Sequence, residues 1–321
     1  MIYDDWANWL NLFSMIAMLG LISLVAQVIS LRYFLFFCQK LAPLQQKWMI
    51  LVWATLPFML MLTTLVPGLS SSQIHNQGTV VGPFGFIHWH HTDLFIYTGW
   101  HGWLLVAVSV WCVSRFAMFV YSQWQLIRRI KLLNEQGSSD TSNNIMVLPT
   151  RDVIAMTIGY LTPQIYVSNG LLEQSSPEQQ RIIFRHETAH LRYRDNLARC
   201  YLDFMTYLLP DILRKPLLQR FTLVTEHIAD HHAAATSDPN DVADTLIAVA
   251  RLQLQSLPQT HGQAYLITSD QLNDRIQELL APSQPARFHL WLLILILGLM
   301  ASGALSAIDA IHHLFDQLLA H

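Results

Sequence analysis

The chain has 321 residues, of which 52% are hydrophobic and 13% are charged, whereas an ordinary soluble domain has about 25% charged residues. The net charge of −3 gives no sign of nucleic-acid binding, so no direct contact with nucleic acid is expected. The three cysteines, Cys38, Cys112 and Cys200, are too few and too widely spaced for a disulfide framework, and we expect them to be reduced.

Four apolar stretches are long enough to cross the hydrocarbon core of a bilayer, which needs about 20 helical residues. They cover approximately residues 9–31, 48–67, 95–114 and 288–308. The N-terminus lacks the basic segment of a signal peptide, so the first stretch is expected to stay as an anchor. The sequence therefore predicts a mostly α-helical membrane protein with four transmembrane helices.

The positive charges indicate how these spans are oriented. All 19 Lys and Arg residues fall in two windows, residues 32–47 and 115–287. Cytoplasmic segments of membrane proteins are enriched in Lys and Arg, so both windows are expected in the cytoplasm and both termini outside. The predicted domains are 1–121, with three transmembrane helices and an outside loop at 68–94; 122–287, a cytoplasmic domain; and 288–321, a fourth transmembrane helix with a short tail.

The cytoplasmic segment begins as a continuation of the third span, to about residue 133. Residues 135–144 are polar and predict an exposed loop, whereas short β-type runs within 145–168 predict a small sheet. A capping-box sequence at Ser176 predicts a helix with no breaker before Pro210. Further helices are expected from Pro216 to about Thr236 and after Pro239. The domain is therefore expected to be α+β.

The first of these helices contains His186-Glu187-Thr188-Ala189-His190. Residues four apart share one face of a helix, so the two imidazoles can bind one Zn²⁺. Glu187 is rotated by about 100° from His186, which places it beside the open position of the metal as a general base. The motif also arises by chance, so its value depends on the helical context and on a third ligand.

Glu226, on the next predicted helix, is the candidate third ligand, because a catalytic zinc keeps three protein ligands and one open position. Asp230 lies four residues later on the same face and could bind the far nitrogen of a ligating histidine. His231 and His232 are better explained as surface polar groups. A structural role, such as pairing with arginines of the same helix, is favoured for Asp195.

The motifs together resemble the BlaR/MecR-type antirepressor membrane metallopeptidases. The resemblance covers about 145–280 and rests on TIGYLTPQIYV from Thr157, SPEQ from Ser176, HETAHLRYRDN from His186, EHIAD from Glu226, and DRI from Asp274. It implies a gluzincin-like zinc metalloprotease domain, with His186, His190 and Glu226 as ligands and Glu187 as base, in a bacterial inner (cytoplasmic) membrane. Classical members carry a penicillin-binding sensor domain after the last span. Only about a dozen residues follow residue 308 here, so β-lactam sensing is not implied.

What the resemblance implies is an endopeptidase that cleaves a cytosolic winged-helix repressor, or itself, in response to a signal from outside. Two alternatives remain: a quality-control metalloprotease of the CAAX-processing or stress-response type, and a non-catalytic receptor stabilised by zinc. The sequence leaves the substrate, the signal and the oligomeric state open, with a homodimer among the alternatives.

Two segments carry further hypotheses. Residues 256–270, β-prone at 264–268, are best explained as a surface connection and alternatively as a self-cleavage or substrate-mimicking strand. The outside loop and the start of the third span carry five histidines, which favour an interfacial belt over a metal sensor. These histidines are His75, His88, His90, His91 and His101.

Overall fold

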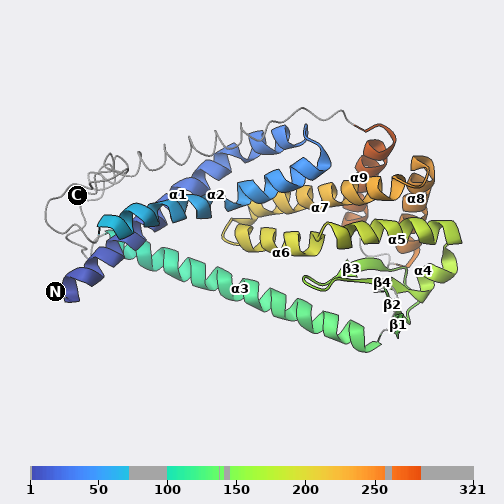
Figure 1. Ribbon diagram of the computed structural model, residues 1–321, viewed down its shortest axis with the longest axis horizontal. Coiled ribbons are helices and arrows are strands. Elements are labelled where there is room, and N and C mark those ends of the chain that lie inside the picture. The colour runs from blue at the N-terminus through green and yellow to red at the C-terminus, as the bar shows by residue number, and fades with distance from the viewer. Residues whose placement is uncertain (1, 72–99, 137, 141–144, 257–261, 283–321) are drawn as a thin grey trace. The chain divides into compact units, whose positions relative to one another are not determined.

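The computed structural model describes residues 2–71, 100–136, 138–140, 145–256 and 262–282 (Figure 1). The described part is mostly helical, with one four-stranded sheet. It divides into two compact units, one of residues 1–34, 52–117 and 287–321 and one of residues 35–51 and 118–286. The second unit contains the HExxH motif and also includes the connection between the first two helices.

Three long helices begin the chain: α1 (Ile2–Cys38), α2 (Pro43–Ser71) and α3 (Trp100–Gln136). In the first unit, α1 and α2 pack side by side, where the Gln27 amide donates to the Trp53 carbonyl at 2.7 Å and the Phe34 ring stacks on Trp53. The helical continuation of α3 beyond the third expected span is confirmed.

Two windows in the described helices, Gly20–Cys38 and Leu105–Glu135, are long and apolar enough to cross a membrane. Their side chains are mostly not buried in the protein: 22% of the first window is buried and none of the second. Apolar side chains such as Val110 and Val113 face outward. A core helix of a soluble protein would bury such residues, so these helices fit an apolar surrounding instead.

Of the other two expected spans, one is described in part and one lies outside the described residues. Residues 48–67 lie in the helix α2, whose side chains are described only in part. The span at 288–308, most of the outside loop and four of its histidines (His75, His88, His90 and His91) lie outside the described residues. His101 lies in the first turn of α3, but its side chain is not described.

The predicted sheet is present and has the order β1-β2-β4-β3. Its strands are β1 (Ser138–Asp140), β2 (Ile145–Leu148), β3 (Ala155–Ile158) and β4 (Gln164–Ser168). β2 and β4 are parallel, and the outer pairs are antiparallel. β1 lies within the segment expected to be only a loop, because it pairs with β2 from Ser138↔Val147 to Asp140↔Ile145.

Successive side chains of β4 point to opposite faces of the sheet and join two separate hydrophobic clusters. Ile165 and Val167 pack with Leu171 and Ile183 on the face covered by the short helix α4 (Asn169–Gln174) and by α5 (Pro177–Arg192). Tyr166 points the other way, toward Met146 and Leu148. A period of two along one strand therefore serves both faces. This packing fixes α5 against β3, the strand at one edge of the sheet.

The capping box at the start of α5 is confirmed: the Ser176 side chain accepts from the Gln179 amide, and the Gln179 side chain accepts from the Ser176 amide. The helix does not continue to Pro210 as expected. It ends at Arg192, and α6 (Asp195–Thr206) follows after a turn in which Arg194 adopts the left-handed conformation, with φ of 52°.

Two further expectations from the sequence were wrong. The helix α7 (Asp211–Ala234) begins five residues before Pro216 and contains that proline. Residues 264–268, expected to be β-prone, lie in α9 (Gly262–Leu280), whose Ile276 and Leu279 join α8 (Pro239–Ser256) and α7 in one apolar cluster. The structure therefore has a helix at the residues where the sequence predicted a β-prone run.

Candidate metal centre

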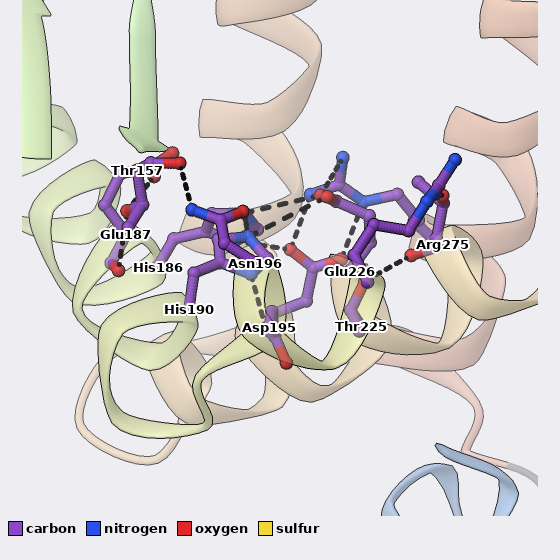
Figure 2. A network of polar contacts seen from close by, with 12 residues as sticks. Thr157, His186, Glu187, His190, Asp195, Asn196, Thr225, Glu226 and Arg275 are labelled. Carbon is purple, nitrogen blue, oxygen red and sulfur yellow. Dashed lines mark hydrogen bonds and ion pairs between the residues drawn. The ribbon is translucent and has the colours of Figure 1, made fainter. Parts of the chain in front are cut away.

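The two helices that carry the motif residues cross in the second unit. α5 brings His186, Glu187 and His190, and α7 brings Glu226 (Figure 2). α5 makes its most extensive helix contact with α7, through an interface that includes Ile182 and Ala233. The packing of these two amphipathic helices therefore brings together residues that are 36 or more positions apart in the sequence.

Three ligand-type atoms converge at this crossing. Nε2 of His186 lies 3.2 Å from Nε2 of His190 and 3.4 Å from Oε2 of Glu226, and Nε2 of His190 lies 3.7 Å from Oε1 of Glu226. Ligands bound at about 2.0–2.1 Å around a tetrahedral metal are about 3.3 Å apart. Among the described residues, this is the group that could hold a metal ion.

Each histidine is also held at its other nitrogen by a carboxylate. Nδ1 of His190 lies 2.7 Å from Oδ2 of Asp195, and Nδ1 of His186 lies 3.0 Å from Oδ1 of Asp230, within ion-pair distance but off the line of a hydrogen bond. Carboxylates at Nδ1 favour a proton there, which leaves the Nε2 lone pairs for a metal. The residues thus fit a divalent metal on the chemistry of their donors as well as on spacing.

Asp230 lies where the sequence hypothesis put it, whereas Asp195 does more than expected. Instead of pairing with arginines of its own region, Asp195 uses one oxygen for His190 and the other for Lys47, at 2.5 Å. His232 lies in contact with the Arg185 carbonyl at 3.3 Å and is only partly buried. His231 is likewise partly buried, so neither position is fully exposed.

Arg275 of α9 neutralises the acidic side of the site, a role that sequence reasoning did not assign. Its guanidinium donates to both oxygens of Asp230, at 2.7 and 2.8 Å, and lies 3.0 Å from Oε2 of Glu226. Such a two-pronged contact fixes both partners in direction as well as in charge. The DRI run that contains Arg275 was a signal available in the sequence, but spacing alone could not connect it with Glu226.

These neighbours shift proton affinities strongly. Burial alone would lower the pKa of His186, but Asp230 and Glu226 raise it to about 10. Burial would raise the pKa of Glu226, but the Arg275 guanidinium and the two histidines hold it well below its usual range. Asp230 follows the same pattern, with Arg275 and His186 lowering its pKa against the effect of burial. The carboxylates of Glu226 and Asp230 are therefore ionised in the metal-free protein.

Glu187 lies beside this group and is held by the sheet. Its Oε2 accepts from the Thr157 hydroxyl of β3 at 2.7 Å, and the same hydroxyl lies 3.1 Å from the Glu187 carbonyl. The Asn196 amide in turn donates to the Thr157 carbonyl at 2.7 Å (Figure 2). The side chain of Glu187 is buried yet lines the cavity at the site. Thr157 and Asn196 belong to the sequence motifs TIGYLTPQIYV and HETAHLRYRDN, but no pattern in the sequence predicts their contacts with Glu187 and with each other.

An open cavity of about 480 Å³ runs past the ligand group. Ala155, Met156 and Thr157 of β3 form one wall, and the motif residues of α5 and α7 form another. Apolar side chains of α8 and α9 close it, including Val242, Leu246, Val249 and Leu272. A carboxylate, three ligand-type atoms and an edge strand therefore share one cavity that could hold an extended chain.

Residues 124–213 match the family model of peptidase family M48. The segment runs from the end of α3 through the sheet and the HExxH helix to the start of α7, and it covers less than a third of the chain. It supports a metallopeptidase. Because it ends before Glu226, the third ligand position rests on the geometry described above. Comparison with curated proteins gave no significant match.

Proposed function

We propose that the protein is an integral membrane zinc endopeptidase of the gluzincin type. The observation that carries the proposal is the convergence of His186, His190 and Glu226 on one point, with Glu187 beside them in the same cavity. Two imidazoles and one carboxylate are a ligand set of catalytic zinc. Zinc bound there would lower the pKa of a bound water and polarise a peptide carbonyl.

Glu187 acts in this proposal as the general base that takes the proton of the attacking water and passes it to the leaving amine. The Thr157 hydroxyl orients its carboxylate through the 2.7 Å hydrogen bond. Asp230 and Asp195 hold the two histidines in the tautomer that binds metal through Nε2. Arg275 offsets the charge of the two acidic residues on α7.

The substrate in this proposal is an extended peptide that lies along β3. Strands at the edge of a sheet bind peptides by adding a strand, and β3 both lies at an edge and lines the cavity. The apolar side chains from α8 and α9 suit an apolar side chain of the substrate.

We further propose that the substrate is cytosolic, a winged-helix repressor or the protein itself, and that a signal from outside controls its cleavage. Support comes from the resemblance over 145–280 and from the distribution of Lys and Arg, which favours a cytoplasmic site. A quality-control membrane metalloprotease would use the same chemistry on a broader set of substrates. The match to family M48 supports the chemistry that the two share.

Glu187→Gln tests the proposal, because it removes the base but keeps a side chain that the Thr157 hydroxyl can contact. We expect the variant to keep about one zinc per chain and to lose proteolysis. Fragments of cytosolic and membrane proteins should be compared by mass spectrometry between cells with the wild type and cells with the variant. One or a few cleaved proteins indicate the repressor type, and many indicate quality control. Equal cleavage by both would overturn the peptidase proposal, and a zinc-stabilised receptor would remain.

A further inference from the structure

Lys47 lies near the start of α2 but is buried, with its side chain only 3% exposed. Lysine is rarely buried unless it is paired. Its Nζ donates to Oδ1 of Asp195 at 2.5 Å and to the Tyr193 carbonyl at 2.7 Å. In the sequence Lys47 is one of three positive charges that indicate a cytoplasmic loop. In the structure it reaches residues about 150 positions away in the chain.

The two groups that Lys47 binds form the ends of the turn between α5 and α6. Tyr193 closes α5, Asp195 opens α6, and Arg194 between them has the left-handed backbone that residues other than glycine rarely adopt. Such a conformation persists where its surroundings hold it. This turn returns the Asp195 carboxylate to within 2.7 Å of Nδ1 of His190. Lys47 therefore fixes the carboxylate that orients one ligand.

Gln46, the residue before Lys47, links the start of α2 to α7, the helix that carries Glu226. The buried Gln46 accepts a hydrogen bond from Nη2 of Arg220 at 2.6 Å and donates to the Leu41 carbonyl at 2.6 Å. Arg220 lies on α7, less than two turns before Glu226. The start of α2 thus contacts both α7 and the end of α5.

We propose that Lys47 is a positioning residue of the metal centre, acting through Asp195 on His190. The inference deepens the proposed function and rests on it for the metal that occupies the site.

The test compares three variants of the full chain in detergent, all in the Glu187→Gln background to prevent self-cleavage. Lys47→Met removes the charge and keeps the length of the side chain, whereas Lys47→Arg keeps the charge. Lys40→Met makes the first of these changes at an exposed lysine between α1 and α2. Zinc affinity is measured by chelator competition, and the ligand geometry by the visible spectrum of the Co²⁺-loaded protein.

Loss of a partner that orients a metal ligand typically weakens metal binding by about 10–100-fold. We expect about tenfold for Lys47→Met, with a changed Co²⁺ spectrum, because Lys47 acts one residue further out. Lys47→Arg should restore most of the affinity, and Lys40→Met should bind zinc like the parent. Parental affinity and spectrum in Lys47→Met would overturn the inference.

A double-mutant cycle with Asp195→Asn tests whether Lys47 acts through Asp195. If Lys47 acts through Asp195, adding Lys47→Met to Asp195→Asn should weaken zinc binding by less than about threefold. Multiplicative losses would overturn the inference. If Lys47→Met alone does not fold, the double variant, which removes both buried charges, still gives the comparison with Asp195→Asn. Because these measurements need no cleavage, a chain that binds zinc as described but cleaves nothing would overturn the peptidase and leave the inference intact.

Discussion

His186 is the residue whose surroundings change its chemistry most. It lies between the carboxylates of Asp230 and Glu226, and in the metal-free protein they hold a proton on its imidazole. A metal must displace that proton before it can bind Nε2. Protons and metal therefore compete for one side chain in a pH range where an ordinary histidine is already neutral.

The pH dependence of zinc binding follows from this competition. The pKa of His186 is about 10 when folded and about 6.5 when unfolded, so its protonation stabilises the metal-free domain below pH 6.5. That stabilisation is lost as the pH rises through about 10. Zinc affinity should change the opposite way, rising about tenfold per pH unit between pH 7 and 9. Chelator competition at several pH values measures it, and an affinity that is constant above pH 7 would contradict the prediction.

Thr157 and Thr188 offer a matched pair for testing the proposed base. The Thr157 hydroxyl donates to Glu187, whereas the exposed Thr188, inside the motif itself, donates to the Phe184 carbonyl of its own helix. Thr157→Val should lower kcat about tenfold, a fraction of what general-base catalysis contributes, and leave the zinc content unchanged. Thr188→Val should retain kcat. The prediction fails if both variants have the same rate, or if Thr157→Val loses zinc.

At the scale of elements, the sequence predicted the features that are local. The capping residues of α5, the runs of β2 and β4, and the helical spacing in α8 are each set within a few positions, and each is found. The sequence did not predict the turn at Tyr193 and Arg194, and both ends of this turn bind Lys47 of α2, a residue far away in the chain. The contact of Arg275 with Glu226 likewise depends on the packing of α9, which no local pattern specifies.

The backbone of α4 lies very close to the backbone of Thr150 and Arg151 at Gly170. A Cβ added to Gly170 would lie 2.1 Å from the Arg151 carbonyl oxygen, and the Gly170 amide donates to the Thr150 carbonyl at 2.9 Å. Backbone cannot move aside as a flexible side chain can, so Gly170→Ala should destabilise the domain by about 3 kcal/mol, at the upper end of overpacking. Glu173→Ala, an exposed change on the same helix, should stay within about 0.5 kcal/mol.

Chemical denaturation in the Glu187→Gln background, followed by far-UV circular dichroism, measures both changes. An unchanged midpoint for Gly170→Ala would mean that the segment at Arg151 is not held against α4. Because this segment leads into β3, a shift of it would also alter the wall of the cavity. The packing of α4 therefore affects both stability and the site.

At the scale of the whole molecule, the charge pattern and the compact units agree on one feature. Residues 35–51 cluster with the unit that contains the metal centre, although residues of the other unit flank them on both sides. Lys40 and Lys47 both lie in this segment, and the charge pattern predicts that their window shares a compartment with residues 115–287. The contact of Lys47 with Asp195 agrees with this prediction, because two residues in contact lie in one compartment.

The fourth expected span decides where the C-terminus lies. Residues 288–321 contain no Lys or Arg, whereas Arg287 ends the second positive window. A reporter fused after Arg287, without the last 34 residues, should therefore be cytoplasmic, and one fused after His321 should be outside. Alkaline phosphatase folds only outside and green fluorescent protein, exported unfolded, fluoresces only inside, so the two reporters should give opposite results at the two positions. Reporters fused after Lys47 should give the same result as those fused after Arg287, because both residues lie in positive windows. Fluorescence of a green fluorescent protein fused after His321 would contradict the prediction, because it would mean that residues 288–308 do not cross the membrane and that Arg287 and His321 lie on the same side.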